Sequence, residues 1–399
     1  MNPIIILLYL LSFLLIWQFV GYPSLMAIVA LKSKPEKKDY SFQPFVSILV
    51  ATYNEEKVIA KRIENLFTLN YPKDKHEVLV VDSGSTDRTT EIVEKFIGQS
   101  NQSQPYLELI KEDKRRGKAS AINLGKEHAK GEIVLIADAN SIFDKNVLRE
   151  MMPHFKNPEF GAVSGRYFIS NPNNILSGSE AFYWEIEHII MLGESYLDSI
   201  STVIGTISAW RKDLMNFRST TISEDLDMTI QTRRNGYKVK YEPDAMVYEP
   251  SATASEDQIK QRKRTSTGTI QNMFKHINYF LPPRNLYTLL IFPSHKILVM
   301  FSPFSLLSIP ILYIVAWDIG IVITHLFLSL FIFAGTLILL MSLKSRLVKN
   351  KGVKSSFSTS AIPKIIYYVL LNEYLILLAW MDFIFQRYSV LWERAESTR

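Results

Sequence analysis

The chain has 399 residues and no cysteine, which excludes disulfide bonds and thiolate metal sites. Charged side chains are missing from three long stretches, 3–31, 297–317 and 319–343. A further apolar stretch, roughly 365–385, is interrupted by only two acidic residues. Because about 20 apolar residues span a bilayer, these segments predict four transmembrane helices. Internal repeats of 20–50 residues and low-complexity tracts are also absent, so a solenoid is excluded.

The first apolar stretch is too long for a signal-peptide core and has neither a positive start nor a small-residue cleavage site. Lys and Arg gather at 32–38 and 344–364, just after the first and third stretches. The positive-inside rule puts both clusters, and the polar region between them, in the cytoplasm. The net charge of +6 comes mostly from these flanks. It therefore indicates attraction to membrane lipids rather than to nucleic acid.

These patterns predict a protein of the plasma membrane with a cytoplasmic catalytic domain. Its expected parts are an N-terminal transmembrane helix (1–31), a cytoplasmic domain (40–280), an interfacial helix (281–296), three transmembrane helices (297–385) and a C-terminal tail (386–399). Glu373, inside the fourth apolar stretch, must face protein or water. It would line an entry path for an acceptor or hydrogen-bond a neighbouring helix.

Apolar runs alternate with helical stretches between about residues 42 and 172. Buried strands are expected at 45–51, 78–82, 107–110 and 133–138, and helices near 55–69, 86–98 and 117–129. This alternation indicates β-α-β units, and hence an α/β domain with a mostly parallel sheet. Residues 173–280 alternate less and are predicted to be helical, packed beside the sheet.

Polar clusters follow the predicted strands. They read TYNEE (52–56), DSGSTD (82–87), KRRGKASAIN (114–123) and DAN (138–140). Ligands bind outside the carboxyl ends of parallel strands, so these clusters should meet at one site. Gly117 and Lys118 open a helix behind three cations, which suits a phosphate or a solvated basic turn. Asp82 suits a base or ribose, whereas Ser85 or Asp87 suits a helix cap.

Three further patterns concern catalysis. Asp138 and Asn140 would hold Mg²⁺ or Mn²⁺ between nucleotide phosphates, or would form an ordinary turn. SEDLD (223–227) crowds three carboxylates, so one or more should have a raised pKa, as a general base needs. Alternatively, it begins a helix that Ser223 caps. Within QRKRT (261–265), Arg264 would grip a diphosphate or belong to a basic surface.

Together these motifs resemble the membrane-embedded family 2 glycosyltransferases, the cellulose-synthase-like and hyaluronan-synthase-like group. The resemblance covers about residues 45–270 and rests on TYNE, DSGSTD, DAN, SED and QRKRT in that order. It implies a nucleotide-sugar-binding domain of the GT-A type. The residues that it assigns to the nucleotide-sugar are Thr52, Tyr53, Asn54, Glu55, Asp82, Gly117, Lys118, Asp138, Gln261 and Arg264. It also implies that Asp138 and Asn140 hold the metal, and that Asp225, with Glu224 beside it, is the catalytic base.

Three positions depart from the family pattern. Asn140 replaces a second Asp, Ser223 replaces Thr, and Thr265 replaces a Trp that in the family lies by the acceptor sugar. The last change weakens the case for a processive polymerase. The expected acceptor residues are Trp184, Trp210, Gly205 and Thr206.

The sequence thus predicts an inverting, metal-dependent transfer from a nucleotide-sugar, UDP-linked, to a glycan or lipid-linked acceptor at the cytoplasmic face. A processive polysaccharide synthase that extrudes its product is the alternative. A catalytically silent nucleotide-binding scaffold is a weaker alternative, because such a protein would not need Asp225, Gln261 and Arg264 together.

Overall fold

The computed structural model describes residues 3–34, 36–99, 104–172, 175–251, 255–316 and 362–390. Its α-helices are α1 (Pro3–Ile16), α2 (Tyr22–Lys32), α3 (Ile59–Phe67), α4 (Thr89–Gly98), α5 (Lys118–His128), α6 (Val147–Met151), α7 (Ile175–Leu197), α8 (Glu224–Arg234), α9 (Ser255–Lys275), α10 (Ile277–Phe280), α11 (Leu298–Ala316) and α13 (Ile362–Ile384). Its strands are β1 (Val46–Thr52), β2 (His76–Asp82), β3 (Tyr106–Lys111), β4 (Ile133–Asp138), β5 (Ile142–Phe143), β6 (Phe160–Ile169), β7 (Ile207–Arg211) and β8 (Lys238–Glu249). Short 3₁₀ or π-helical segments are η1 (Trp17–Gly21), η2 (Lys73–Lys75), η3 (Met152–Lys156), η4 (Lys212–Leu214), η5 (Tyr287–Ile291) and η6 (Pro293–Ile297).

Within these residues the strands form one eight-stranded sheet, in the order β3-β2-β1-β4-β7-β6-β8-β5. The first four are parallel, whereas β7 runs antiparallel to both β4 and β6. The register pairs Thr52 with Asp82 and Ala51 with Asp138. The carboxyl ends of β1, β2 and β4 therefore lie at one edge, where ligands bind in sheets of this kind.

The four strands and three helices predicted before residue 172 are confirmed. Strands β1, β2 and β4 are buried almost throughout, because helices cover both faces of the sheet. Right-handed crossovers place α3 and α4 on one face and return α5 on the other. Gly125 in α5 packs directly against Leu49 and Val81, so a larger residue there would have to displace these side chains.

The prediction that residues 173–280 are helical is wrong in part, because β7 and β8 lie there and join the sheet. Buried charges hide β8 from pattern analysis. Lys240 and Glu242 are only 5% and 2% exposed. Lys240 pairs with Glu36 at 2.5 Å, and Glu242 pairs with His154 at 2.6 Å. Each buried charge is paired with a residue far away in the sequence, so β8 can carry charged side chains at positions where a buried strand usually has apolar ones.

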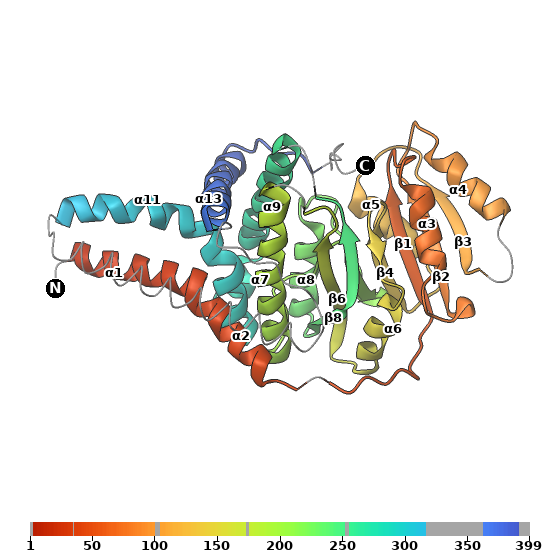
Figure 1. The fold of residues 1–399 in the computed structure, drawn as a ribbon, viewed down its shortest axis with the longest axis horizontal. Helices are drawn as coiled ribbons and strands as arrows, with labels where there is room; N and C mark the ends of the chain where they lie inside the picture. The colour runs from red at the N-terminus through yellow and green to blue at the C-terminus, as the bar shows by residue number, and fades with distance from the viewer. Residues whose placement is uncertain are drawn as a thin grey trace.

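Two long apolar helices extend together from the end of the molecule opposite β3 and α4 (Figure 1). Among the described residues, Pro3–Lys32 and Tyr287–Val315 are the helices long and apolar enough to cross a membrane, by length and composition. Within them α1 packs against α11. Their outward side chains remain apolar and exposed, as for Phe13 (60%) and Ile314 (70%), which suits a lipid environment.

The segment before α11 differs from expectation. Residues 287–296 do not form a separate interfacial helix but continue through η5 and η6 into α11. Pro293 lies inside this continuous helical segment, directly after Phe292, which joins η5 to η6.

Four transmembrane helices are not confirmed. The stretch 319–343 lies outside the described residues. The fourth stretch forms α13, which is not one of the two described helices that meet the spanning criteria. Figure 1 shows α13 beside α9, lying across the α1–α11 pair rather than along it. Glu373 is 7% exposed and accepts a 2.7 Å hydrogen bond from Ser302 of α11. The predicted hydrogen bond to a neighbouring helix is therefore observed.

Candidate active site

The loops after β1 and β2 brace one another. Asn54 has φ 55°, in the left-handed region that Asn tolerates, and its side-chain oxygen accepts the N–H of Thr86 at 2.7 Å. The Asn54 N–H donates to Ser85 Oγ at 2.8 Å, and the Ser85 N–H donates to Asp82 at 3.0 Å. Thr52 and Asp82 are buried at the ends of their strands. This wall of the site is therefore rigid before any ligand arrives.

Two other acidic residues of this region have structural contacts. Glu55 is 3% exposed, and its backbone N–H donates to Thr89 Oγ1 at 2.8 Å. Asp87 accepts the Thr89 N–H at 3.0 Å where α4 begins, which is the helix-start role weighed for it. The Tyr53 ring carries the Arg115 guanidinium 4.1 Å from its centroid. The base-binding assignment of Tyr53 and Glu55 stays a prediction.

The KRRGK turn places Lys118 at the site. Gly117 has φ 94°, a conformation that favours glycine, and α5 starts at the next residue. The Lys118 Nζ lies 2.6 Å from Asp138 Oδ1. Burial lowers the pKa of Lys118, but Asp138, Glu224 and Asp225 together raise it above its usual range. Lys118 thus joins the end of β4 to the start of α8 electrostatically.

The DAN segment forms a turn directly after β4. Asp138 and Asn140 are half-buried while Ala139 between them is buried, and the two side chains contact Lys118 and Glu249 respectively. The Ser141 N–H and Oγ both donate to the Asp138 carbonyl, at 3.4 and 2.9 Å, as in an ordinary turn. The turn and a role in the site are compatible. The turn uses the backbone carbonyl of Asp138, whereas its side-chain carboxylate lies near Lys118.

The acidic residues of SEDLD separate into two groups. Burial raises the pKa of Glu224 and of Asp225 above their ordinary values, and the cations of Lys118 and Arg264 only partly oppose this. The Asp225 carboxylate accepts the N–H of Leu226 at 2.8 Å. A Cβ on Gly205 would lie 3.0 Å from its other oxygen, so only glycine leaves that carboxylate its present space.

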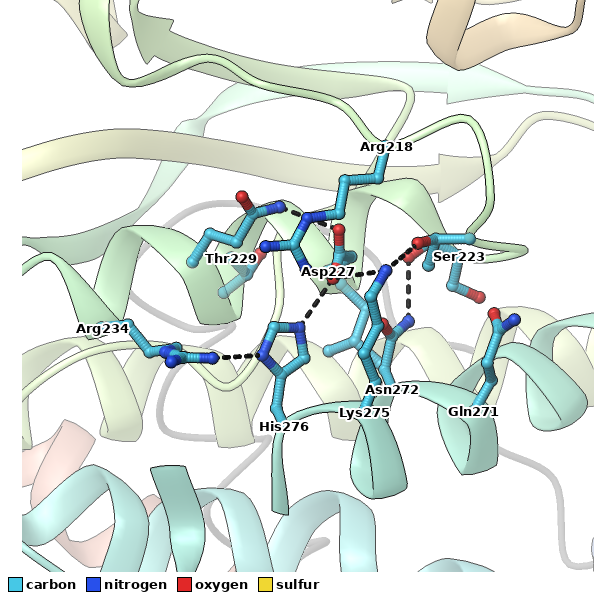
Figure 2. Close-up of polar contacts among 12 residues, drawn as sticks. Arg218, Ser223, Asp227, Thr229, Arg234, Gln271, Asn272, Lys275 and His276 are labelled. Carbon is cyan, nitrogen blue, oxygen red and sulfur yellow. Dashed lines mark hydrogen bonds and ion pairs between the residues drawn. The ribbon is translucent and has the colours of Figure 1, made fainter. Parts of the chain in front are cut away.

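Asp227, the third acid, lies among Arg218, Lys275 and His276 (Figure 2). It is fully buried and contacts His276 at 2.7 Å, with Lys275 and Arg218 each at 3.4 Å. Burial opposes its ionisation, yet His276, Lys275 and Arg218 lower its pKa. Sequence reasoning missed this cluster, because no local pattern links residue 227 to residue 276.

Helix α9 packs against the start of α8. Arg264 Nη2 donates to the Ile222 carbonyl at 3.1 Å, close to the acidic pair, whereas Gln261 is exposed. A Cβ on Gly268 would lie 2.2 Å from Ser223 Oγ, so the two backbones approach closely there. Ser223 stands at the N-cap position of α8, but its hydroxyl makes no capping bond, which corrects the predicted cap.

The four predicted acceptor residues lie in different environments. Gly205 touches Asp225, and the next residue, Thr206, has a buried hydroxyl without a hydrogen-bond partner among the described residues. Trp184 is half-buried in α7 and packs on Tyr167 at 4.6 Å. The assignment of Trp210 is wrong: its side chain is fully buried in the sheet core, where its indole donates to Ser208.

Oxygen donors at the end of β4 fit a hard divalent cation, since Asp138 offers a carboxylate and Asn140 an amide group. The described residues also contain a carboxylate group with metal-like spacing, Glu150, Glu242 and Asp244. Lys38 already lies 2.5 Å from Glu150 and 2.9 Å from Glu242. That group lies on α6 and the middle of β8, and Lys38 already occupies the space between Glu150 and Glu242.

A mixed sheet with an acidic and basic site at its carboxyl edge defines a GT-A-like glycosyltransferase domain. The family model for glycosyl transferase family group 2 matches residues 133–343, over half of the chain. The family model for glycosyl transferase family 2 matches residues 47–217. The chain belongs to this family. The resemblance seen in the sequence is thereby confirmed at the level of family 2.

Two curated relatives illustrate the range of the family. Beta-monoglucosyldiacylglycerol synthase of Synechocystis sp. is 30% identical over 287 residues, 67% of this chain and 57% of that protein. Poly-beta-1,6-N-acetyl-D-glucosamine synthase of Staphylococcus epidermidis is 30% identical over 229 residues, 56% of this chain and 54% of that protein. The chain thus spans about half the length of these relatives.

Among solved structures, the mannosyltransferase PcManGT from Pyrobaculum calidifontis, in complex with GDP-Man and Mn²⁺, superposes with a TM-score of 0.69. It is 23% identical, and the match covers 96% of this chain and 100% of that one. At this identity the likeness shows the fold.

Proposed function

We propose that the protein is an inverting, membrane-bound glycosyltransferase that uses a nucleotide-sugar, UDP-linked, at the cytoplasmic face of the plasma membrane. Its acceptor is a glycan or a lipid-linked molecule. Family membership supports the transfer reaction. The two apolar helices, Pro3–Lys32 and Tyr287–Val315, support the membrane location, and the Lys-rich segment after the first supports the cytoplasmic face.

One observation carries the proposal: Lys118 lies 2.6 Å from Asp138 and within electrostatic reach of Glu224 and Asp225. A donor diphosphate beside Asp138 would therefore lie near the acid that activates the acceptor. Such closeness is what a one-step transfer requires, because the acceptor oxygen must reach the anomeric carbon while the diphosphate leaves.

In the proposed reaction Asp225 takes the proton of the acceptor hydroxyl, and its raised pKa suits a base that works near neutral pH. The acceptor oxygen bonds to the anomeric carbon as the bond from that carbon to the diphosphate breaks, and the electron pair leaves with the diphosphate. Lys118 and Arg264 stabilise the negative charge that develops there. Asp138 and Asn140 would hold Mg²⁺ or Mn²⁺, which supplies further positive charge to the diphosphate.

Addition of a single sugar is favoured over polymerisation by Thr265, which is exposed on α9 and cannot stack on a sugar as a Trp does. The glucosyldiacylglycerol synthase relative supports a lipid acceptor, and the poly-N-acetylglucosamine synthase relative supports the processive alternative. Gly205 and Thr206, next to Asp225, are the residues proposed to meet the acceptor.

The test is a screen of nucleotide-sugars for release of UDP or GDP by the purified protein, with labelled donor to size the product. We expect Asp225→Asn to keep nucleotide binding and to abolish transfer, whereas Asp213→Asn, at an exposed position, stays active. EDTA should stop transfer and Mn²⁺ or Mg²⁺ should restore it. Near-normal turnover of Asp225→Asn would refute the base assignment, and a ladder of products would favour the processive alternative.

A further inference from the structure

The end of β4 carries one carboxylate where the family pattern has two. Asn140 offers only a neutral amide oxygen, so Asp138 is the sole negative group of the DAN turn. Hard divalent cations bind most strongly where several carboxylate oxygens converge. A second negative side chain from another element would therefore restore the charge that Asn140 lacks.

Strand β8 brings such a side chain to the turn. The short strand β5 pairs antiparallel with β8, Ile142 opposite Tyr248 and Phe143 opposite Val247. Extending this register by one pair places Glu249 against the DAN turn. The Asn140 Nδ2 donates to Glu249 Oε1 at 2.9 Å, and both side chains are half-buried, so solvent ions can reach them.

A buried cation, Arg62, lies beside the same turn. Arg62 is fully buried, with its guanidinium 3.9 Å from the Phe143 ring centroid, and its Nη1 donates to the Ser141 carbonyl at 2.9 Å. Its Nε and Nη2 have no hydrogen-bond partner among the described residues. Burial lowers the pKa of Arg62 to about 9, while Asp138 and Glu249 both act to raise it. One guanidinium thus lies within electrostatic reach of both carboxylates.

We propose that Glu249 supplies the second carboxylate of the divalent-cation site, together with Asp138 and Asn140. This inference rests on the proposed function and names a further residue of the same site. The hydrogen bond from Asn140 holds Glu249 in place, and the β5–β8 pairing fixes its backbone. Arg62 offsets part of the negative charge of the two acids.

The test measures Mn²⁺ binding directly, from the free-ion electron paramagnetic resonance signal of the full chain in detergent with excess UDP. The variants are Glu249→Gln, Asn140→Asp and the double variant, with Asp138→Asn as the reference for loss. Glu159→Gln is the control of equal charge change. Its side chain is 60% exposed and pairs with Lys238 at the far end of β8. Melting temperatures without Mn²⁺ establish that each variant folds.

We expect Glu249→Gln to raise the dissociation constant for Mn²⁺ about 10- to 100-fold, as loss of a supporting group at a metal site does. Asn140→Asp in the Glu249→Gln background should restore it to within about 3-fold of wild type, because a carboxylate returns to the same cluster. Should Glu249→Gln fail to fold, Glu249→Asp takes its place. It keeps the charge but withdraws it by one methylene, and the same rescue is expected.

Three results would overturn the inference. Unchanged Mn²⁺ affinity in Glu249→Gln, with binding lost in Asp138→Asn, refutes Glu249 and leaves the proposed function intact. Weakened affinity that Asn140→Asp does not rescue means that Glu249 acts only by holding the turn. Absence of Mn²⁺ binding by the wild type refutes the metal-dependent reaction itself, and the role of Glu249 with it.

Discussion

Replacing Asp227 with Ala is expected to destabilise the junction between α8 and α9 severely. The acid is fully buried and contacts His276 at 2.7 Å, with Lys275 and Arg218 at 3.4 Å (Figure 2). Removing one partner of a buried ion pair costs about 3–5 kcal/mol, because the remaining charge is left buried. Lys275 and Arg218 are 27% and 38% exposed and can turn to water, so the lower end, about 3 kcal/mol, applies.

A loss of about 3 kcal/mol lowers the melting temperature of a domain of this size by about 6–12 °C. The assay is thermal unfolding of the detergent-solubilised chain, followed by circular dichroism, with Asp213→Ala as the exposed control. The contribution of Asp227 also has a definite pH dependence. Its folded pKa lies below the ordinary 3.8, so its stabilisation is complete above that value and is lost as pH falls through the folded pKa. A melting temperature within about 2 °C of wild type at pH 7 would refute the anchoring role.

Three further predictions concern the acidic pair and its neighbours. Gly205→Ala should lower turnover about 10- to 100-fold with little change in the KM for the donor, because the new Cβ displaces the Asp225 carboxylate. The control is Gly98→Ala, whose Cβ meets open space and which should leave turnover unchanged in the same transfer assay. Turnover of the wild type should fall on acidification at a pH above 3.8, the ordinary pKa of an Asp side chain. Asp225→Asn should raise the melting temperature at pH 7.5, because the ionised acid that it replaces disfavours folding there. Lys118→Met should raise the KM for the donor about 10-fold or more and should also lower the melting temperature, because Asp138, Glu224 and Asp225 lose the cation that they share; kinetics and unfolding curves will show both effects.

The half of the site built on the parallel strands could be predicted because the signal is local. A buried apolar run ending in Thr52, Asp82 or Asp138 identifies both the strand and the edge at which its polar residue emerges. Parallel pairing then brings those ends together without further information.

The other half depends on contacts between residues far apart in the sequence. β8 has Lys240 and Glu242 at buried positions, paired with residues that precede it by 204 and 88 positions, so its pattern resembles a polar segment. With β8 unrecognised, nothing placed Glu249 beside Asn140. The prediction for Trp210 failed for a different reason: an aromatic side chain can stack on a sugar, but in β7 this one is buried in the core.

Two carboxylates of α8, two residues apart, have pKa values that are shifted in opposite directions. Asp225 is half-buried and desolvation raises its pKa, so near neutral pH its ionised form costs stability. Asp227 has a lowered pKa, so its ionised form returns stability over the same range. The anchor that holds it comes from α9, which also supplies Arg264 and packs Gly268 against Ser223. Because α13 packs on α9, a displacement of α13 would reach Asp225 through a single intervening helix. The start of α8 is thus positioned by α9 and α13, whereas the loops that carry Thr52, Asp82 and Asp138 are positioned by the sheet.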